Sequence, residues 1–364
     1  MDSIDFFVLQ NNMLQNNMSQ STDHFFTIFD ALEAVRRLRL CPPDTHPPKP
    51  VTIHIAPGRY YEKLTIAEPY VTLLGDHADT TILTFDDCAR DVMADGSKRG
   101  TFRSYSVLID THDVVLRNLT IENSSFPRSR AGQAIALYAD GDRLIIDHCH
   151  LLSYQDTLFT GPLPPCALSP GGFTGPKEFA PRINGRQYYY NCLICGDIDF
   201  IFGSATAYFD HCEIRSVHSE DLFADVTSGT AQTPVYGYIT AASTAKDQTY
   251  GYVFWKCHLT SDCPDQSVYL GRPWRNFAKT VFLYCEMDSH IRPEGFHDWN
   301  KSEAQDTIYY GEYKSTGIGA HSKEKRAPYT HALASYDVPL YSPESVLSGT
   351  DGWQPEINCI NFYI

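Results

Sequence analysis

A short frame recurs six times in this chain and restricts its fold more than any other feature. The frame consists of two apolar residues separated by one position, followed two positions later by a small or polar residue. Its copies, at intervals of 20 to 45 residues, are Leu119-Ile121-Asn123, Cys149-Leu151-Ser153, Cys192-Ile194-Gly196, Cys212-Ile214-Ser216, Cys257-Leu259-Ser261 and Cys285-Met287-Ser289. Because side chains alternate along a strand, both apolar positions of a copy share one face. Such a period is typical of a solenoid in which each copy forms one rung.

The rest of the chain also has an all-β texture. Short β-branched and aromatic runs, separated by Gly, Asp, Asn and Ser turns, occur at residues 51–55, 70–74, 114–116, 144–146, 252–255 and 281–283. No regular helices lie between them, which argues against alternating strands and helices. One helix is predicted before them, at residues 27–38, because Ile28, Leu32 and Val35 have helical spacing behind the capping pair Thr27 and Asp30.

The predicted organisation is a single domain with decorations. Residues 1–24 are rich in Gln, Asn, Met and Ser and are predicted to be a polar tail. The domain then spans residues 25–364, and the Pro- and Gly-rich segment 161–182 is an inserted loop near the site. The frame is lost after residue 309, where four prolines predict extended chain with short helices packed on the strands.

The charge balance limits the possible partners. The chain has 29 basic and 44 acidic residues and a net charge of -15, without a cluster of five Lys or Arg, so nucleic acid and anionic membranes are poor partners. A polyanionic substrate would require a locally positive site. No apolar run is long enough to span a membrane. Since no signal peptide is visible, we expect a cytoplasmic protein, or a secreted one whose signal has been removed. The oligomeric state cannot be read from the sequence.

The cysteines are expected to be structural thiols. Five of the eleven occupy the first position of the frame and would stack inside the solenoid as small apolar side chains. A zinc site is the alternative, suggested by Cys192, Cys195 and the segment 148–150. Along a strand, however, Cys192 and Cys195 point to opposite faces, and no second ligand pair follows. We therefore predict neither a metal nor a cofactor.

Two aspartates occupy equivalent positions in the repeat. Asp156 and Asp199 each follow the first position of their copy by seven residues. On successive rungs their backbones would lie about 4.8 Å apart. Two carboxylates that close cannot both ionise easily, so one pKa rises. This pairing predicts an acid and a nucleophile made from the same residue type.

Other polar and aromatic residues suit the same site. Gln155 and Gln133 can donate amide N–H groups to a developing oxyanion. Arg272 offers a fork of donors that would hold one carboxylate ionised, and Trp274 offers a flat face to a sugar ring. Asp197 shares the strand face of Asp199 by alternation; if close, it would raise the pKa values of its neighbours, and otherwise it is a solvated turn residue.

Several motifs resemble those of the pectin methylesterases: GRYYE at 58–62, YQDTL at 154–158, DFIFG at 199–203 and LGRPW at 270–274. The resemblance extends from Phe26 to Trp353 and implies a right-handed parallel β-helix. It also implies roles for seven residues: Asp199 as nucleophile, Asp156 as general acid and base, Gln155 and Gln133 as oxyanion donors, Arg272 as the partner of the nucleophile, and Phe202 and Trp274 as the lining of a sugar cleft.

The resulting hypothesis is hydrolysis of galacturonate methyl esters in pectin or oligogalacturonides. A glycoside hydrolase acting on the same polymer is a second hypothesis, although it would have no use for oxyanion donors. A non-catalytic carbohydrate-binding solenoid is a third. The sequence departs from the family in two places: Asp156 and Asp199 are unusually far apart, at 43 residues, and Asp197 replaces a common Thr. Tyr60 and Glu62 are assigned to structure despite lying in a family motif.

Overall fold

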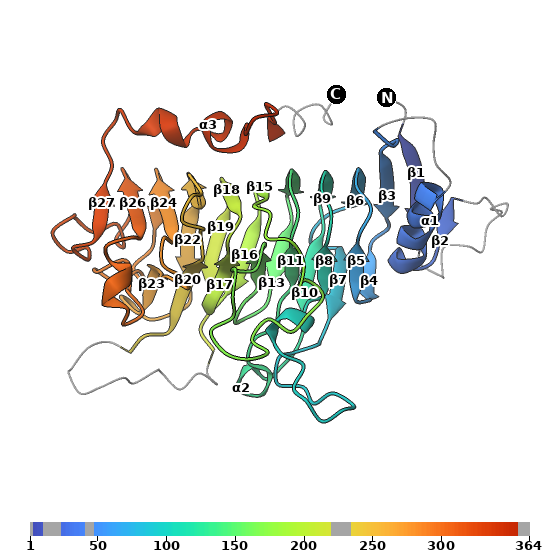
Figure 1. Ribbon diagram of the computed structural model, residues 1–364, viewed down its shortest axis with the longest axis horizontal. Coiled ribbons are helices and arrows are strands. Elements are labelled where there is room, and N and C mark those ends of the chain that lie inside the picture. Colours follow the sequence, from blue (N-terminus) through green and yellow to red (C-terminus); the bar gives the residue numbers. More distant parts are fainter. Residues whose placement is uncertain (1–2, 10–22, 41–46, 220–233, 356–364) are drawn as a thin grey trace.

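The structure, a computed structural model, describes residues 3–9, 23–40, 47–219 and 234–355. Its strands wind into one right-handed parallel β-helix (Figure 1), which confirms the solenoid predicted from the repeated frame and the fold implied by the resemblance. From β3 (Val51–Ile55) to β26 (Tyr309–Tyr313) consecutive strands join different sheets, so neighbours within a sheet belong to successive turns of the coil. We call the three sheets A, B and C.

Sheet A has twelve strands, in the order β2 (His24–Phe25), β1 (Ile4–Val8), β3 (Val51–Ile55), β6 (Val71–Gly75), β9 (Val114–Arg117), β12 (Leu144–Asp147), β15 (Arg186–Tyr190), β18 (Thr206–Asp210), β21 (Tyr252–Trp255), β24 (Lys279–Leu283), β26 (Tyr309–Tyr313) and β27 (Thr330–Ala332). Sheet B has eight, in the order β25 (Glu286–Met287), β22 (His258–Ser261), β19 (Glu213–Ser216), β16 (Leu193–Gly196), β13 (His150–Leu152), β10 (Thr120–Asn123), β7 (Thr81–Phe85) and β4 (Gly58–Tyr61). Sheet C has seven, in the order β23 (Val268–Gly271), β20 (Gly237–Ala242), β17 (Ile198–Gly203), β14 (Leu158–Thr160), β11 (Leu137–Ala139), β8 (Val107–Ile109) and β5 (Leu64–Ile66).

The repeated frame forms the interior of sheet B, which confirms the predicted register. The middle positions of successive copies pair directly across the sheet: Ile121 with Leu151, then Ile194, Ile214, Leu259 and Met287. All six side chains are fully buried. Each copy therefore points its apolar positions into the coil, where every turn covers its neighbours.

The cysteines of the frame form a buried column beside these residues. Cys149, Cys192, Cys212, Cys257 and Cys285 are at most 1% exposed. The thiol of Cys192 contacts the carbonyl oxygens of Ile146 and Tyr190 at 3.3 and 3.4 Å. All nine cysteines in the described ranges are free thiols. The same ranges contain no group of three or more His, Cys, Asp or Glu that could hold a metal ion.

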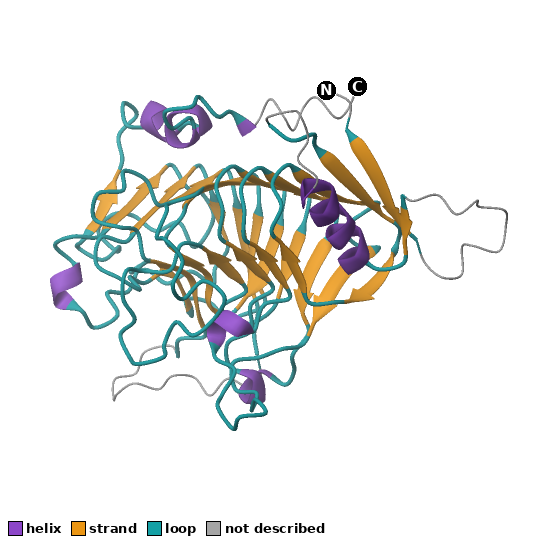
Figure 2. Ribbon diagram, turned by 45° about the vertical axis from the view of Figure 1, so that its right-hand side comes forward, coloured by secondary structure: helices purple, strands orange, loops and turns teal. Residues whose placement is uncertain are grey.

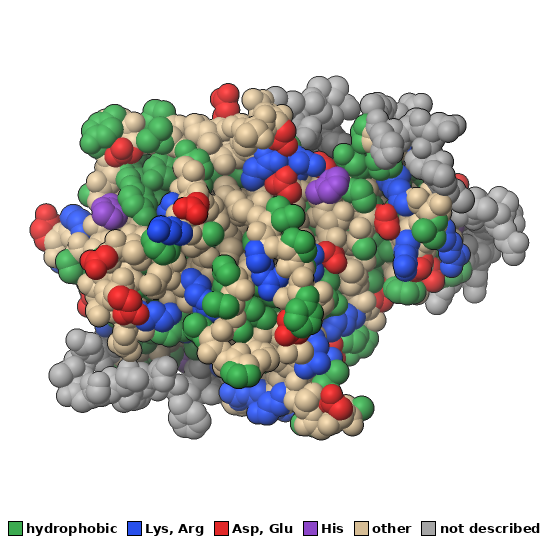
Figure 3. All heavy atoms as spheres, viewed as in Figure 1, with side chains coloured by type: hydrophobic (Ala, Val, Ile, Leu, Met, Phe, Trp, Pro, Cys, Tyr) green, Lys and Arg blue, Asp and Glu red, His purple; other side chains and the backbone are tan. Residues whose placement is uncertain are grey.

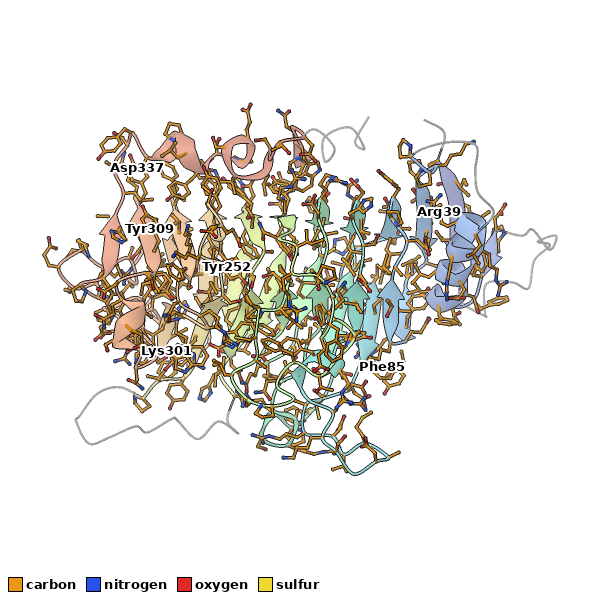
Figure 4. The ribbon with its side chains drawn as sticks, viewed as in Figure 1. Arg39, Phe85, Tyr252, Lys301, Tyr309 and Asp337 are labelled. Carbon is orange, nitrogen blue, oxygen red and sulfur yellow. The ribbon has the colours of Figure 1, made fainter. Side chains whose placement is uncertain are left out.

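An aromatic column fills the interior beneath sheet A. The rings of Tyr189, Phe209, Phe254 and Phe282 stack on successive rungs with centroid distances of 4.7, 4.5 and 4.5 Å. Each stacked pair stabilises the fold by about 0.5–1.5 kcal/mol beyond the contribution of its buried area. Tyr252, labelled in Figure 4, bonds the hydroxyl of Thr160 at 2.6 Å and so links sheet A to sheet C across the interior.

Helix α1 (Ile28–Leu40) lies at the N-terminal end of the coil (Figure 2). It buries Ile28, Leu32 and Val35, as predicted, and Thr27 accepts the backbone N–H of Asp30 at 3.0 Å. Glu62 also accepts the backbone N–H groups of Ile28 and Phe29 at 3.1 and 2.9 Å. Glu62 therefore caps the positive end of the helix, which confirms its structural assignment.

Tyr60 is structural as well. Its ring is buried, at 6% exposed, and its hydroxyl donates to the carbonyl oxygen of Ala56 at 2.8 Å. None of the helices in the described part of the chain is long and apolar enough to cross a bilayer.

The N-terminal prediction was wrong for residues 4–8. They form strand β1, which pairs with β2 and β3 in sheet A, rather than part of a polar tail. Phe6 and Val8 alternate into the core at 5% and 0% exposure, whereas Phe7 is 37% exposed. The short alternation is masked in the sequence by the Gln- and Asn-rich stretch that follows. Residues 10–22 of the predicted tail lie outside the described ranges.

The C-terminal prediction was correct only in part. Strands β26 and β27 extend sheet A beyond the last copy of the frame. Only then does the chain leave the coil and run back along the sheet toward the N-terminal half through a 3₁₀ turn at Val338–Tyr341 and helix α3 (Pro343–Leu347) (Figure 1). Leu347 is fully buried, and the guanidinium of Arg186 holds Asp351 at 2.6 and 2.9 Å.

Candidate active site

The register of sheet C places the two aspartates opposite each other. Strands β14 and β17 are neighbours, with Leu158 opposite Ile201. Two residues earlier on each chain segment are Asp156 and Asp199, which therefore occupy adjacent rungs. The backbone N–H of Asp156 donates to the carbonyl oxygen of Ile198 at 3.1 Å, so the close pairing continues to this point.

Both aspartates border a cavity of about 270 Å³ on the outer side of sheet C. All seven site residues predicted from the sequence line it: Gln133, Gln155, Asp156, Asp199, Phe202, Arg272 and Trp274. The others are Thr101, Phe102, Gly172, Ala241 and Trp299. Thr101, Phe102 and Gly172 come from the long loops that Figure 1 shows hanging beside the coil. The repeat thus supplies the floor of the cavity, and the loops supply its walls.

Arg272 binds one aspartate with both arms of its fork. Its Nε and Nη2 donate to the two carboxylate oxygens of Asp199 at 2.8 and 2.7 Å. The guanidinium is held between two rings, because its central carbon lies 3.8 Å from the ring centroids of both Tyr238 and Trp299. This clamp leaves Arg272 little freedom, so the carboxylate of Asp199 is fixed in direction as well as bound.

The environment of Asp156 favours its protonated form. Its side chain is buried, and burial is the largest cause that raises its pKa well above the ordinary value of an aspartate. The charge of Asp199 raises the pKa further, and the charge of Arg272 opposes both effects. The two aspartates therefore differ, since one is paired with a cation and the pKa of the other is raised by its surroundings.

The two glutamines lie side by side on adjacent rungs. Gln133 and Gln155 form a parallel β-bridge, and the backbone N–H of Ala134 donates to the carbonyl oxygen of Gln155 at 3.0 Å. Since both side chains border the cavity, their amides can converge on one substrate oxygen. Gln155 is further held by Arg128, whose Nη2 lies 3.3 Å from its side-chain oxygen.

The aromatic lining divides into a floor and a rim. Phe202 is only 4% exposed and packs against Phe159 and Trp274, with centroids 4.9 and 5.7 Å apart. It therefore shapes the floor and offers little free surface, whereas the half-buried Trp274 presents more of its ring. Phe173, from the loop 161–182, lies 6.1 Å from Trp274 and extends the aromatic wall.

Asp197 is not a solvated turn residue. It is 1% exposed, and the side chain of Arg128 binds its carboxylate through Nε and Nη2. Asp197 is also close enough to Asp156 to raise the pKa of that carboxyl, although it contributes less than burial and Asp199. The predicted influence of a third acid is therefore present, and a paired cation reduces it.

Three contributors to the site were missed from the sequence. Tyr238, Trp299 and Arg128 lie outside the motifs and the repeated frame. Arg128 and Asp197 are separated by 69 residues, so no local pattern could link them.

Comparison with known proteins agrees with this geometry. The Pectinesterase family model matches residues 18–162 and 182–349, leaving between them a stretch that falls within the loop 161–182. Pectinesterase 31 from Arabidopsis thaliana is 31% identical over 77% of this chain and 78% of its own length. Putative pectinesterase 11 from the same plant is 30% identical over 91% of this chain and 78% of its own length.

Solved structures give the same picture. A pectin methylesterase in complex with a hexasaccharide is 27% identical, with a TM-score of 0.72 over 98% of this chain and 99% of its own. Pectin methylesterase PemA from Erwinia chrysanthemi is 26% identical, with a TM-score of 0.72 over 97% and 98% of the two chains. The enzyme from carrot is 27% identical, with a TM-score of 0.70 over 93% of each chain.

Proposed function

Because the chain belongs to the pectinesterase family, whose members are carboxylic ester hydrolases, we propose that it hydrolyses the C6 methyl esters of galacturonate units with Asp199 as nucleophile. The substrate is pectin or a methylated oligogalacturonide. The observation that carries the proposal is the pair of opposed aspartates on adjacent rungs, of which only Asp199 is bound by the fork of Arg272. This difference in environment supports the proposed roles of Asp199 as nucleophile and Asp156 as acid.

In the first half of the reaction, Asp199 forms the acyl-enzyme. Its carboxylate oxygen attacks the ester carbonyl carbon, and the carbonyl oxygen becomes an oxyanion that accepts N–H bonds from Gln155 and Gln133. The intermediate then collapses and the bond to the methoxy oxygen breaks. Asp156 gives its proton to that oxygen, so that methanol leaves as a neutral molecule.

In the second half, water cleaves the acyl-enzyme. Asp156, now ionised, takes a proton from the attacking water, and the oxygen adds to the substrate carbonyl carbon. The bond to Asp199 breaks, which releases a galacturonate carboxylic acid and restores both aspartates. Burial and the neighbouring charge again favour the protonated form of Asp156, and the cycle can repeat.

The cations around the cavity suit a uronate chain, although the whole molecule is acidic. The side chains of Arg275 and Lys301 both donate to the carbonyl oxygen of Trp274, at 2.9 and 3.2 Å, so two positive charges lie beside the rim (Lys301 is labelled in Figure 4). Figure 3 also shows Lys and Arg side chains gathered at the lower edge of the face, by the loops around helix α2 (Arg128–Ala131). These groups supply a local positive field.

The proposal is tested by methanol release from methylated galacturonate oligomers of graded length. The wild-type protein should release methanol without producing new reducing ends, whereas Asp199→Asn and Asp156→Asn should not release it at a comparable rate. New reducing ends would instead indicate a glycoside hydrolase. Unchanged behaviour of Asp199→Ala would favour a binding solenoid.

A further inference from the structure

Arg128 and Asp197 form an ion pair beneath the proposed catalytic site. Arg128 lies in the short helix α2, and Asp197 immediately precedes β17, the strand that carries Asp199. The Arg128 side chain is 7% exposed and that of Asp197 is fully buried. The second oxygen of Asp197 also accepts the backbone N–H of Ile198 at 2.5 Å. The pair is therefore fixed to the backbone next to Asp199.

Arg128 also contacts a proposed oxyanion donor. Its Nη2 donates to Asp197 at 3.2 Å and to the side-chain oxygen of Gln155 at 3.3 Å. A glutamine amide has a donor end and an acceptor end, and the two are nearly equal in shape. A guanidinium can only donate hydrogen bonds, so of the two ends of the amide it can bond only the oxygen. With the oxygen turned to Arg128, the NH₂ group of Gln155 faces away from it.

We propose that Arg128 and Asp197 are positioning residues that hold the amide of Gln155 with its NH₂ group toward the reacting ester. The inference rests on the proposed function, because it assigns a purpose to one part of that site. An amide free to rotate by half a turn would present its oxygen to the oxyanion for part of the time. That orientation repels the developing charge instead of stabilising it.

Asp197 is needed because Arg128 is buried. A guanidinium without a partner at this depth would be costly, and it would turn toward another carboxylate. The carboxyl group of Asp156 is the nearby alternative, since Arg128 already affects its pKa. By binding both Nε and Nη2, Asp197 keeps Arg128 away from Asp156 while leaving Nη2 able to contact Gln155.

The test is a double-mutant cycle between Arg128 and Gln155, measured by methanol release. Loss of a single oxyanion donor lowers kcat by about 100- to 1,000-fold. We expect Arg128→Met to lower kcat by about ten- to a hundredfold, because the amide is misdirected rather than absent, with KM nearly unchanged. In a Gln155→Ala background the same substitution should have no further effect on kcat. Arg128→Lys, which keeps a donor, should recover part of the loss.

Arg117 provides a matched control. It forms a similarly buried ion pair, with its Nε 2.6 Å from Asp147, but the pair joins β9 and β12 of sheet A, whereas the two catalytic aspartates lie along sheet C. Arg117→Met should lower the unfolding midpoint about as much as Arg128→Met does and should leave kcat unchanged well below that midpoint.

Two results would overturn the inference. One is an equal fall in kcat for Arg128→Met with Gln155 present and with Gln155→Ala. The other is that Arg128→Met has the same kcat as Arg117→Met, while the wild-type protein releases methanol. If the wild type releases no methanol, the proposed function fails first, so the two failures are distinguishable.

Discussion

Removal of the Arg272 side chain should both destabilise the folded protein and abolish methanol release, and the structure indicates the size of the loss in stability. The side chains of Arg272 and Asp199 are only 14% and 9% exposed. Breaking such a pair by removing one partner costs about 3–5 kcal/mol, because the remaining charge is buried alone. The loss of the two ring contacts of the guanidinium adds about 1 kcal/mol, since methionine still packs between Tyr238 and Trp299.

For Arg272→Met we therefore expect a loss of about 4–6 kcal/mol of unfolding free energy. Unfolding entropy is about 2.1 cal/mol/K per residue, or about 0.8 kcal/mol/K for a chain of 364 residues, so the melting temperature should fall by about 5–8 °C. Thermal unfolding followed by circular dichroism measures this change. Methanol release should be lost in the same variant.

The double variant Asp199→Asn/Arg272→Met separates the two causes. It leaves no unpaired charge, so we expect it to regain most of the lost stability while it remains inactive. If the double variant melts as low as Arg272→Met, the buried charge is not the origin of the loss. If Arg272→Met melts like the wild type, the clamp described above does not hold Asp199.

Further substitutions test other parts of the account. Asp156→Asn should be inactive. Because the folded state raises the pKa of this carboxyl, the stability of the wild type falls as the pH rises above about 4, whereas the variant lacks that loss. Urea titrations should therefore show that the stability of the variant, relative to the wild type, increases with pH. Glu62→Ala removes the cap of α1 and should lower the unfolding free energy by about 1 kcal/mol without changing kcat. Phe173→Ala opens the wall formed by the inserted loop and should raise KM severalfold for methylated oligomers with little change in kcat; an unchanged KM would separate this loop from substrate binding.

The fold was largely predictable because its pattern is local and repeated. Each copy of the frame contains its own alternation of buried and exposed positions. Asp156 follows Cys149, and Asp199 follows Cys192, by the same number of residues, and this was enough to align the two aspartates. Strand β1 was missed because its alternation covers only five residues and has no repeat to support it. Strands β26 and β27 were missed because they join sheet A after the frame has ended.

The partners of the site were less predictable than the two aspartates. Arg272 is recognisable because it belongs to a motif, but Tyr238 and Trp299, which clamp it, come from different turns of the coil. Their roles arise only when the chain folds, since nothing in their local sequence distinguishes them from other aromatic residues. The same holds for Arg128, whose contact with Asp197 spans 69 residues.

The most direct test of the account is to determine which aspartate carries the proton. Infrared spectroscopy at neutral pH detects the C=O stretch of a protonated, buried carboxylic acid. We predict that this band is present in the wild type, is lost in Asp156→Asn and persists in Asp199→Asn, because burial is the main cause that raises the pKa of Asp156. A band that disappears in Asp199→Asn and remains in Asp156→Asn would reverse the proposed roles of the two residues.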